Sequence, residues 1–196
     1  MVRTPAPPGP TPLEEKLLEL AGAVPDPELP VVTLAELGVL RGLHLTGPGR
    51  VEVELTPTYT GCPAVEAMAA DIERVLHDEG IPEVQVRTVL TPAWSTDDIT
   101  PEGRRKLGES GVAPPRPGAR TGGPVALALG PTRLSGTPRE PVPVPAPGSG
   151  TTPEPVRCPH CGSADTTLLS RFSSTACKAL RRCGTCHEPF DHFKEL

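Results

Sequence analysis

The feature that most constrains this 196-residue chain is a proline-rich stretch over residues 113–156. Those residues include 12 prolines and seven glycines, in sequences such as EPVPVPAPGSG. Proline lacks the backbone N–H that helices and inner strands require, and glycine adds conformational freedom, so such a segment forms neither element. Closely spaced prolines instead favour extended polyproline II structure. We therefore expect a flexible linker at 113–156 between two folded units, and a disordered proline-rich tail at 1–12.

Residues 13–112 show the hydrophobic periodicity of a small mixed domain. Leucines at helical spacing in LEEKLLELAGAV predict a helix that ends before VPDPELP. Alternating apolar residues in GVLRGLHLT and RVEVELT, joined by a Gly-Pro-Gly turn, predict an antiparallel hairpin with one polar face. A helix from Pro63 to about Asp78, a strand in EVQVRTVL and a short helix in PEGRRKLGES follow. The predicted fold class is α+β, a small two-layer sandwich with a three-stranded sheet.

The C-terminal residues 157–196 contain two C-x-x-C knuckles. The paired cysteines are Cys158 with Cys161 and Cys183 with Cys186. Two such knuckles offer four thiolates to one tetrahedral Zn²⁺, which leaves no coordination position open for a substrate. A unit this small has little apolar material, so metal binding would supply folding free energy. We predict a four-cysteine zinc ribbon; iron is an alternative metal, and a redox role is an alternative for the thiols.

Cys177, in SSTACKALRRC, is left over from the two knuckles. One interpretation is a small buried residue or a neighbour of the metal. The other is a second redox or metal-transfer thiol beside Lys178. The sequence leaves both interpretations open.

Cys62, in PTYTGCPAVEAM, stands where the long helix is predicted to begin. A thiol at a helix N-cap meets unpaired N–H groups and the positive end of the helix dipole, which favour the thiolate. We therefore predict a lowered pKa for Cys62, an effect that nearby carboxylates would oppose. A buried space-filling role is the alternative. No histidine follows in the arrangement of a Cys-His hydrolase.

The segment VPDPELP is the other candidate for a functional role. Its alternating prolines predict a rigid turn in which the carboxylates of Asp26 and Glu28 point in fixed directions. A plain turn with solvated acids is the alternative. Thr58 and Tyr59, just before Cys62, are ambiguous in the same way.

The charge distribution excludes some classes of function. Residues 13–112 carry 8 Lys and Arg against 18 Asp and Glu, a net charge of −10, which would repel nucleic acid. No apolar run is long enough to cross a membrane, and the N-terminus lacks an apolar signal segment. The chain also lacks a glycine-rich phosphate loop and Glu-x-x-His pairs for a di-iron centre. We expect a cytoplasmic protein, in whose reducing compartment paired cysteines bind metal more often than they form disulfides.

Several of these segments carry a family resemblance. The stretches DPELPVVTLAELGVLRGLHL, LTPTYTGCPAVEAM and VLTPAWSTDDITPEGRRKL resemble the metal-sulfur cluster biosynthesis domain, the family of SufT-like proteins and of a eukaryotic cytosolic iron-sulfur assembly factor. The stretch CPHCGSADTTLLSRFSSTACKALRRCGTCHEPFDHFK resembles the C-terminus of the PaaD family, accessory subunits of phenylacetyl-CoA epoxidase. That family pairs the two units, although the long linker departs from its compact pattern.

The resemblance implies an accessory role in phenylacetate catabolism for a chain that is not catalytic by itself. Such a chain would assist iron or iron-sulfur cofactor assembly in the di-iron oxygenase or the flavin and iron-sulfur reductase of the epoxidase. The matching motifs mark Cys62 as a metal-transfer thiol, with Asp26, Glu28, Thr58 and Thr60 around it. One cysteine cannot hold a cluster, so we expect transient ligation of iron or a cluster in a homodimer or partner complex. A scaffold subunit in which Cys62 is silent is the alternative.

Overall fold

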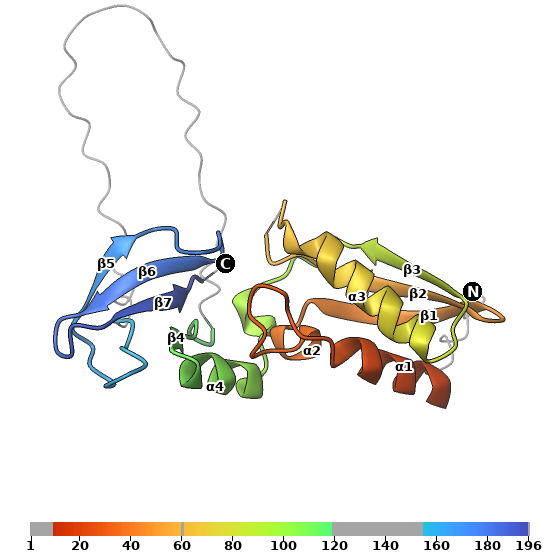
Figure 1. Cartoon of the computed structure of the whole chain (residues 1–196), viewed down its shortest axis with the longest axis horizontal. Coiled ribbons are helices and arrows are strands. Elements are labelled where there is room, and N and C mark those ends of the chain that lie inside the picture. Colours follow the sequence, from red (N-terminus) through yellow and green to blue (C-terminus); the bar gives the residue numbers. More distant parts are fainter. Residues whose placement is uncertain (1–9, 60, 119–154, 196) are drawn as a thin grey trace, which may run out of the picture.

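The computed structural model describes residues 10–59, 61–118 and 155–195, and Figure 1 shows their arrangement. The N-terminal unit comprises α1 (Pro12–Gly22), α2 (Leu34–Leu37), β1 (Leu40–Gly47), β2 (Arg50–Leu55), α3 (Ala64–Asp78), β3 (Glu83–Thr88), η1 (Thr96–Asp98) and α4 (Pro101–Glu109). The ribbon comprises β5 (Thr166–Ser170), β6 (Lys178–Cys183) and β7 (Pro189–Phe193), and strand β4 (Val112–Ala113) connects the two units. The chain is therefore an α+β protein, as the sequence predicts.

The N-terminal unit is a two-layer sandwich of a three-stranded sheet and helices. Strands run in the order β1-β2-β3, with β1 and β2 antiparallel and β2 and β3 parallel. The long helix α3 makes the crossover that a parallel pair requires, and it packs with α1 over the sheet (Figure 1). On the other face, Glu52 and Glu54 of β2 form ion pairs with Arg87 of β3. The predicted hairpin with one polar face is thus confirmed.

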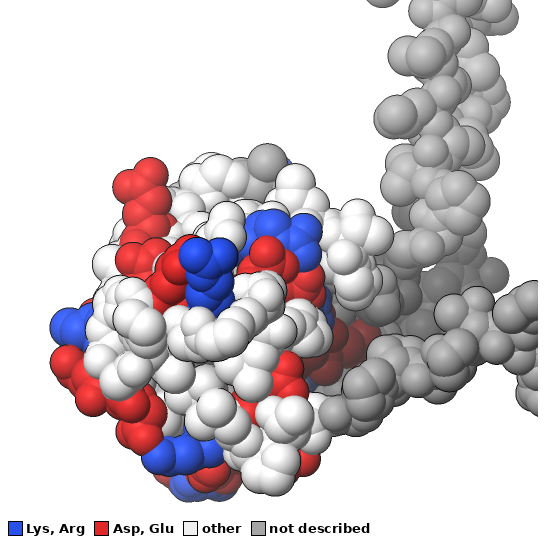
Figure 2. Space-filling model, turned by 90° about the vertical axis from the view of Figure 1, so that its right-hand side faces the viewer, with Lys and Arg blue, Asp and Glu red and all other residues white. Residues whose placement is uncertain are grey.

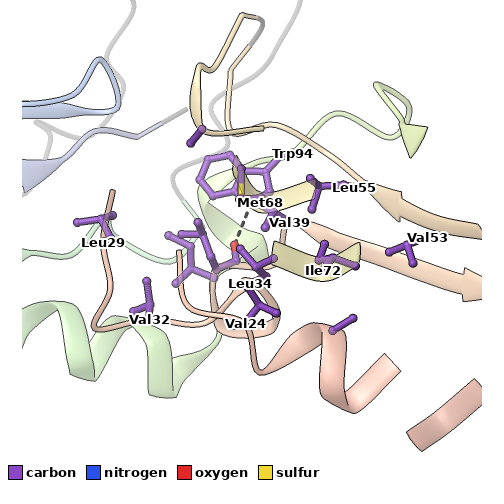
Figure 3. Close-up of a cluster of buried hydrophobic side chains, with 14 of the residues drawn as sticks. Val24, Leu29, Val32, Leu34, Val39, Val53, Leu55, Met68, Ile72 and Trp94 are labelled. Carbon is purple, nitrogen blue, oxygen red and sulfur yellow. Dashed lines mark hydrogen bonds between the residues drawn. The ribbon is translucent and has the colours of Figure 1, made fainter. Parts of the chain in front are cut away.

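The core of this unit lies between the helices and the sheet. Its fully buried side chains include Leu17, Val53, Ile72 and Leu76. Burying each such aliphatic side chain contributes about 1.5–3 kcal/mol. Trp94 closes one end of the core, where its indole Nε1 donates a hydrogen bond of 2.9 Å to the carbonyl oxygen of Leu37 (Figure 3).

Capping residues fix where the helices begin. In α1, Thr11 and Glu14 form a reciprocal capping box, so the ordered chain begins within the stretch expected to be a tail. The rest of that stretch, 1–9, lies outside the described residues. In α4, the Thr100 hydroxyl accepts from the N–H of Gly103 and Pro101 occupies the first helical position, as predicted.

The ribbon is a second sheet, with strand order β4-β7-β6-β5. Strand β4 belongs to the stretch expected to be linker from residue 113 onward, and that boundary is wrong. Ala113 is buried and pairs with His192 of β7, and this pairing orders the chain in spite of the prolines that follow. The described residues continue to 118, and the remainder of the expected linker, 119–154, lies outside them.

The surface agrees with the charge pattern of the sequence. Figure 2 shows the end of the molecule that lies at the right of Figure 1, where acidic and basic side chains are interspersed and no continuous basic patch appears. Within the described part of the chain, no helix has the length and apolar character needed to span a bilayer.

Candidate functional site

The four knuckle cysteines of the ribbon converge on one point. Their sulfur atoms all lie within 4.8 Å of one another. The Sγ atoms of Cys158 and Cys186 are 3.7 Å apart, and those of Cys161 and Cys183 are 3.5 Å apart. Four sulfurs at about 2.3 Å from a tetrahedral Zn²⁺ are separated by about 3.8 Å. The donor set therefore fits a closed zinc site.

The backbone of each knuckle is shaped to present its thiols. The residue after the second cysteine is left-handed in both knuckles, Gly162 with φ 74° and His187 with φ 65°. In the second knuckle, the N–H groups of Thr185 and Cys186 donate to Sγ of Cys183 at 3.4 and 3.5 Å. The N–H of Cys186, and then that of Thr185, lower the pKa of Cys183 to about 6. This favours the thiolate, the form that binds metal.

Cys62 occupies the turn between β2 and α3. The N-cap of α3 is Pro63, so the prediction that Cys62 itself is the N-cap is wrong by one residue. Burial raises the pKa of the Cys62 thiol, and the charges of Glu28 and Asp26 raise it further, against the N–H of Ala64 and the hydroxyl of Thr58, which lower it. The predicted lowering of this pKa is also wrong, because desolvation and the two carboxylates outweigh the helix N–H groups.

The acidic turn lies beside Cys62. Asp26 is 5 % exposed, and its Oδ1 accepts hydrogen bonds from the N–H groups of Glu28 at 2.9 Å and Leu29 at 2.7 Å. Its own N–H donates to the carbonyl of Val32, which closes the turn. Burial raises the pKa of Asp26, and burial followed by the charge of Asp26 raises that of Glu28. Oδ2 of Asp26 is not among the buried polar atoms of the described residues that lack a partner.

The ribbon contributes two further groups to this region. Cys177 is 4 % exposed, and burial is the main cause of its raised pKa, with the charge of Glu28 adding to it. Lys178 is buried, pairs with Asp191 at 3.1 Å, and places its charge near Asp26 and Glu28. We call Cys62, Cys177, Asp26, Glu28, Tyr59 and Lys178 the Cys62 site. It therefore draws on both units of the chain.

Tyr59 lies near enough to both thiols for their charges to act on its phenol. Burial raises the pKa of its phenol, and the charges of Cys62, Glu28 and Cys177 act in the same direction. Sequence reasoning did not bring Cys177 and Lys178 together with Cys62, since nothing in the local sequence indicates which surface the ribbon contacts. Thr58 lies beside Cys62, whereas Thr60 lies outside the described residues.

Aromatic packing holds the ribbon in this position. The rings of Trp94 and Phe193 are 5.9 Å apart between centroids, at an angle of 49°. Phe193 and Cys177 belong to the same hydrophobic cluster as Trp94. At the neighbouring edge, Arg116 forms an ion pair of 2.8 Å with Glu195.

The two cysteine-containing regions differ in how tightly their ligand atoms are grouped. Within the described ranges, the four ribbon cysteines are the one group of three or more such side chains that is placed to hold a metal ion. The Cys62 site is thus not a closed metal cage. It places two thiols and two carboxylates near the boundary between the units.

Known protein families match both units of the chain. The PaaD zinc beta ribbon domain family matches residues 143–194, and the family of iron-sulfur cluster assembly proteins matches residues 14–91. A putative 1,2-phenylacetyl-CoA epoxidase subunit from Escherichia coli (strain K12) is 40 % identical over 183 residues, which cover 93 % of each chain. This chain belongs to the PaaD family.

Shorter relatives match only part of this PaaD-family chain. An Fe-S protein maturation auxiliary factor from Porphyromonas gingivalis is 29 % identical over 96 residues, 48 % of this chain and 90 % of the relative. Two solved structures each cover 48 % of the chain. A domain of unknown function from Bacillus anthracis is 29 % identical, with a TM-score of 0.45 and 91 % of its length matched. A conserved hypothetical protein from Thermotoga maritima is 28 % identical, with a TM-score of 0.41 and 93 % of its length matched.

Proposed function

We propose that this PaaD-family chain is a cytoplasmic accessory subunit of a phenylacetyl-CoA epoxidase system in phenylacetate catabolism. In this proposal it assists iron or iron-sulfur cofactor assembly in a partner component and performs no catalysis by itself. The E. coli relative, whose name gives it as an epoxidase subunit, supports the pathway. The match of residues 14–91 to iron-sulfur cluster assembly proteins supports the maturation role.

The observation that carries the proposal is the position of Cys62 beside two carboxylates. Iron accepts both sulfur and oxygen ligands, and Cys62 with Asp26 and Glu28 supplies both. The hydroxyl of Thr58 stabilises the thiolate of Cys62. Thr60, next to this turn in the sequence, is proposed as a further residue of the site. Burial and the two carboxylates raise the pKa of Cys62 and so favour its thiol over its thiolate. We assign Cys62 to transient binding of the metal during transfer.

The number of ligands that the chain supplies indicates which partners it needs. A cluster requires about four protein ligands, so a homodimer or the client protein completes the shell during transfer. We assign the client to the di-iron oxygenase or to the flavin and iron-sulfur reductase of the epoxidase. The ribbon zinc is structural and takes no part in the transfer, although four thiolates would also accept iron.

One surface favours a second candidate, a scaffold subunit of the same complex. The side chains of Leu168, Leu169 and Phe172 are exposed on and just after β5, the edge strand of the ribbon sheet. Exposed apolar side chains on a sheet edge are typical of protein contacts. In this alternative the ribbon binds epoxidase components and Cys62 is silent.

Cofactor analysis separates the two candidates. The oxygenase and reductase are purified from cells with and without this protein, and iron, sulfide and flavin are measured in each component. We expect iron to fall in one component, which identifies the client. Normal cofactor content in both components, together with failure of the complex to assemble, would replace the maturation role with the scaffold role.

A further inference from the structure

We propose that a cavity lined by both units of the chain binds a small carboxylate that carries an apolar group. This inference goes beyond the proposed function and does not depend on it, because no residue of the Cys62 site lines the cavity. It makes the contact between the two units responsive to a small molecule.

The cavity has a volume of about 260 Å³ and lies where β4 pairs with β7. It is lined by Arg104 of α4, residues 113–117, residues 155–157 and His192 of β7. Its wall is preformed, because backbone pairing holds Ala113 against His192 and Arg104 donates to the carbonyl of Pro115. One water occupies about 30 Å³, so the cavity has room for one small organic molecule.

Positive charge is concentrated at this cavity, although the N-terminal unit as a whole is acidic. Three of the lining residues are arginines, Arg104, Arg116 and Arg157. Arg116 pairs with Glu195 at 2.8 Å, and the charge of Asp97 acts on Arg104. Three guanidinium groups are thus accompanied by two carboxylates, which leaves one positive charge for a ligand to neutralise.

Arg104 and Arg157 retain donors for such a ligand. The guanidinium of Arg104 donates to the carbonyls of Thr96, at 2.6 Å, and Pro115. That of Arg157 donates to the carbonyl of Gly162 at 3.2 Å. A guanidinium carries five N–H groups in a planar fork that matches a carboxylate, so most of the donors of these two side chains remain for a ligand.

His192 adds a neutral donor to the cavity. Its side chain is 7 % exposed, and its ring forms no hydrogen bond within the part of the chain that the structure describes. Burial lowers the pKa of His192 to about 4, so at pH 7 the ring is neutral and one of its two nitrogens carries a proton. This N–H can donate to a carboxylate oxygen without adding a second charge.

The rest of the wall is apolar. It is formed by four prolines, Ala113 and Val156. Inorganic phosphate gains nothing from such a wall, whereas a hydrocarbon group is removed from water when it lies against it. A single uncompensated charge beside an apolar wall therefore matches a monocarboxylate with a hydrocarbon group better than it matches a phosphate.

The test uses the full zinc-loaded chain and phenylacetate as the probe, because this ion joins a carboxylate to an apolar ring. Isothermal titration calorimetry compares it with 2-phenylethanol, which lacks the charge, and with acetate and inorganic phosphate, which lack the ring. We expect phenylacetate to bind at least about tenfold more tightly than any of the three, because only it uses both the arginines and the apolar wall.

Arg157→Gln should lower the affinity for phenylacetate about tenfold or more. Arg182→Gln is the matched control, because Arg182 is also an exposed arginine of the ribbon that donates to a carbonyl at 3.2 Å, that of His187, and it does not line the cavity. Its substitution should leave the affinity unchanged. Zinc content and the melting temperature show whether each variant is folded, and Arg104→Gln replaces Arg157→Gln if the latter loses zinc.

Nuclear magnetic resonance locates the bound probe. In the wild-type chain, nuclear Overhauser effects should connect the ring protons of phenylacetate to the methyl groups of Val156, and the ring nitrogen signals of His192 should shift on binding. The inference would be overturned by absence of binding at about 10 mM phenylacetate, by equal binding of 2-phenylethanol or phosphate, by wild-type affinity in the folded arginine variant, or by contacts of the probe elsewhere only.

Discussion

The larger buried cluster runs through the N-terminal unit from α1 to α4 and β4 and includes Cys177 and Phe193 of the ribbon, whereas the ribbon's own cluster is formed by Ala113, Cys158, Cys183 and Phe190. The first is a core of aliphatic side chains that can stabilise a fold by burial alone. The second consists largely of metal ligands and one aromatic ring. The ribbon's other large buried side chain, Phe193, packs into the core of the N-terminal unit instead. The comparison indicates that the ribbon needs zinc to fold, because it places its largest fully buried side chain in the neighbouring core, whereas the N-terminal unit has an extensive aliphatic core of its own.

Zinc removal should have the largest effect on stability, and this effect should be confined to the ribbon. Apparent binding free energies of structural zinc are about 10–16 kcal/mol, far more than the ribbon's small cluster can replace. We expect a strong chelator, or Cys183→Ser, to abolish hydrogen-exchange protection of β5 to β7 and leave β1 to β3 and α3 protected. Hydrogen exchange with mass spectrometry and zinc analysis measure both effects. A ribbon that stays protected without metal would show that its apolar contacts suffice.

A core substitution should give the reverse pattern. Leu76 is fully buried in α3, so Leu76→Ala should lower the free energy of unfolding of the N-terminal unit by about 2–5 kcal/mol. Zinc affinity should remain unchanged. A fall in zinc affinity in this variant would mean that the two units are less independent than their cores indicate.

Phe193→Ala is expected to have an effect on stability of similar size, because it removes the side chain that joins the two cores. Phe193 is fully buried, and truncation of such a ring costs about 3–5 kcal/mol. Phe172→Ala is the matched control, since Phe172 is 64 % exposed and its loss should cost about 0.5 kcal/mol or less. Chemical denaturation of the zinc-loaded chain measures both. Equal effects of the two substitutions would contradict the docking of the ribbon through Phe193.

Acid should weaken the contact between the ribbon and the N-terminal unit, where His192 of β7 pairs with Ala113 of β4. Burial lowers the pKa of His192 to about 4, so the folded chain keeps this histidine neutral below the pH at which the unfolded chain protonates it. Stability is therefore lost as the pH falls from about 6.5 toward 4, by about 2–3 kcal/mol. His192→Gln should remove this part of the pH dependence, and His44→Gln, at an exposed position, should not. Melting curves at several pH values measure both variants, and an unchanged pH dependence in His192→Gln would show that His192 does not cause the loss of stability in acid.

A change in linker length should have the smallest effect on zinc affinity and stability. The closure entropy of a flexible segment changes by about 0.6 kcal/mol per doubling of its length. We expect deletion of ten residues within 119–154 to leave zinc affinity and the melting temperature of the N-terminal unit nearly unchanged. A large loss in either quantity would mean that the proline-rich sequence makes specific contacts.

The sequence predicted the elements that depend on local pattern. The hairpin of β1 and β2, helix α3 and the strand β3 follow from periodicity, and the cysteine spacing predicted the four-sulfur cluster. Strand β7 was missed because PFDHF has no clean alternation, and α2 because it is a single turn. Strand β4 was missed because its two residues are strand only through their pairing with β7.

The Cys62 site was only partly predictable. Asp26, Glu28 and Thr58 were expected near Cys62 from the resemblance, and they lie there. The direction of the Cys62 pKa shift was wrong, because burial and charge depend on the folded surroundings rather than on position in a helix. The placement of Cys177 and Lys178 depends on how the ribbon docks through Phe193, which no local pattern encodes.

The most direct test of the account is the cofactor content of the epoxidase components in cells that carry Cys62→Ser. Serine keeps the size of the side chain, and Cys62 is only partly buried against the core, so the chain should retain its fold and one zinc ion in the ribbon. The account predicts that iron in one component, the oxygenase or the reductase, falls to the level found without this protein. Wild-type iron in both components, with the variant present at normal abundance, would contradict it.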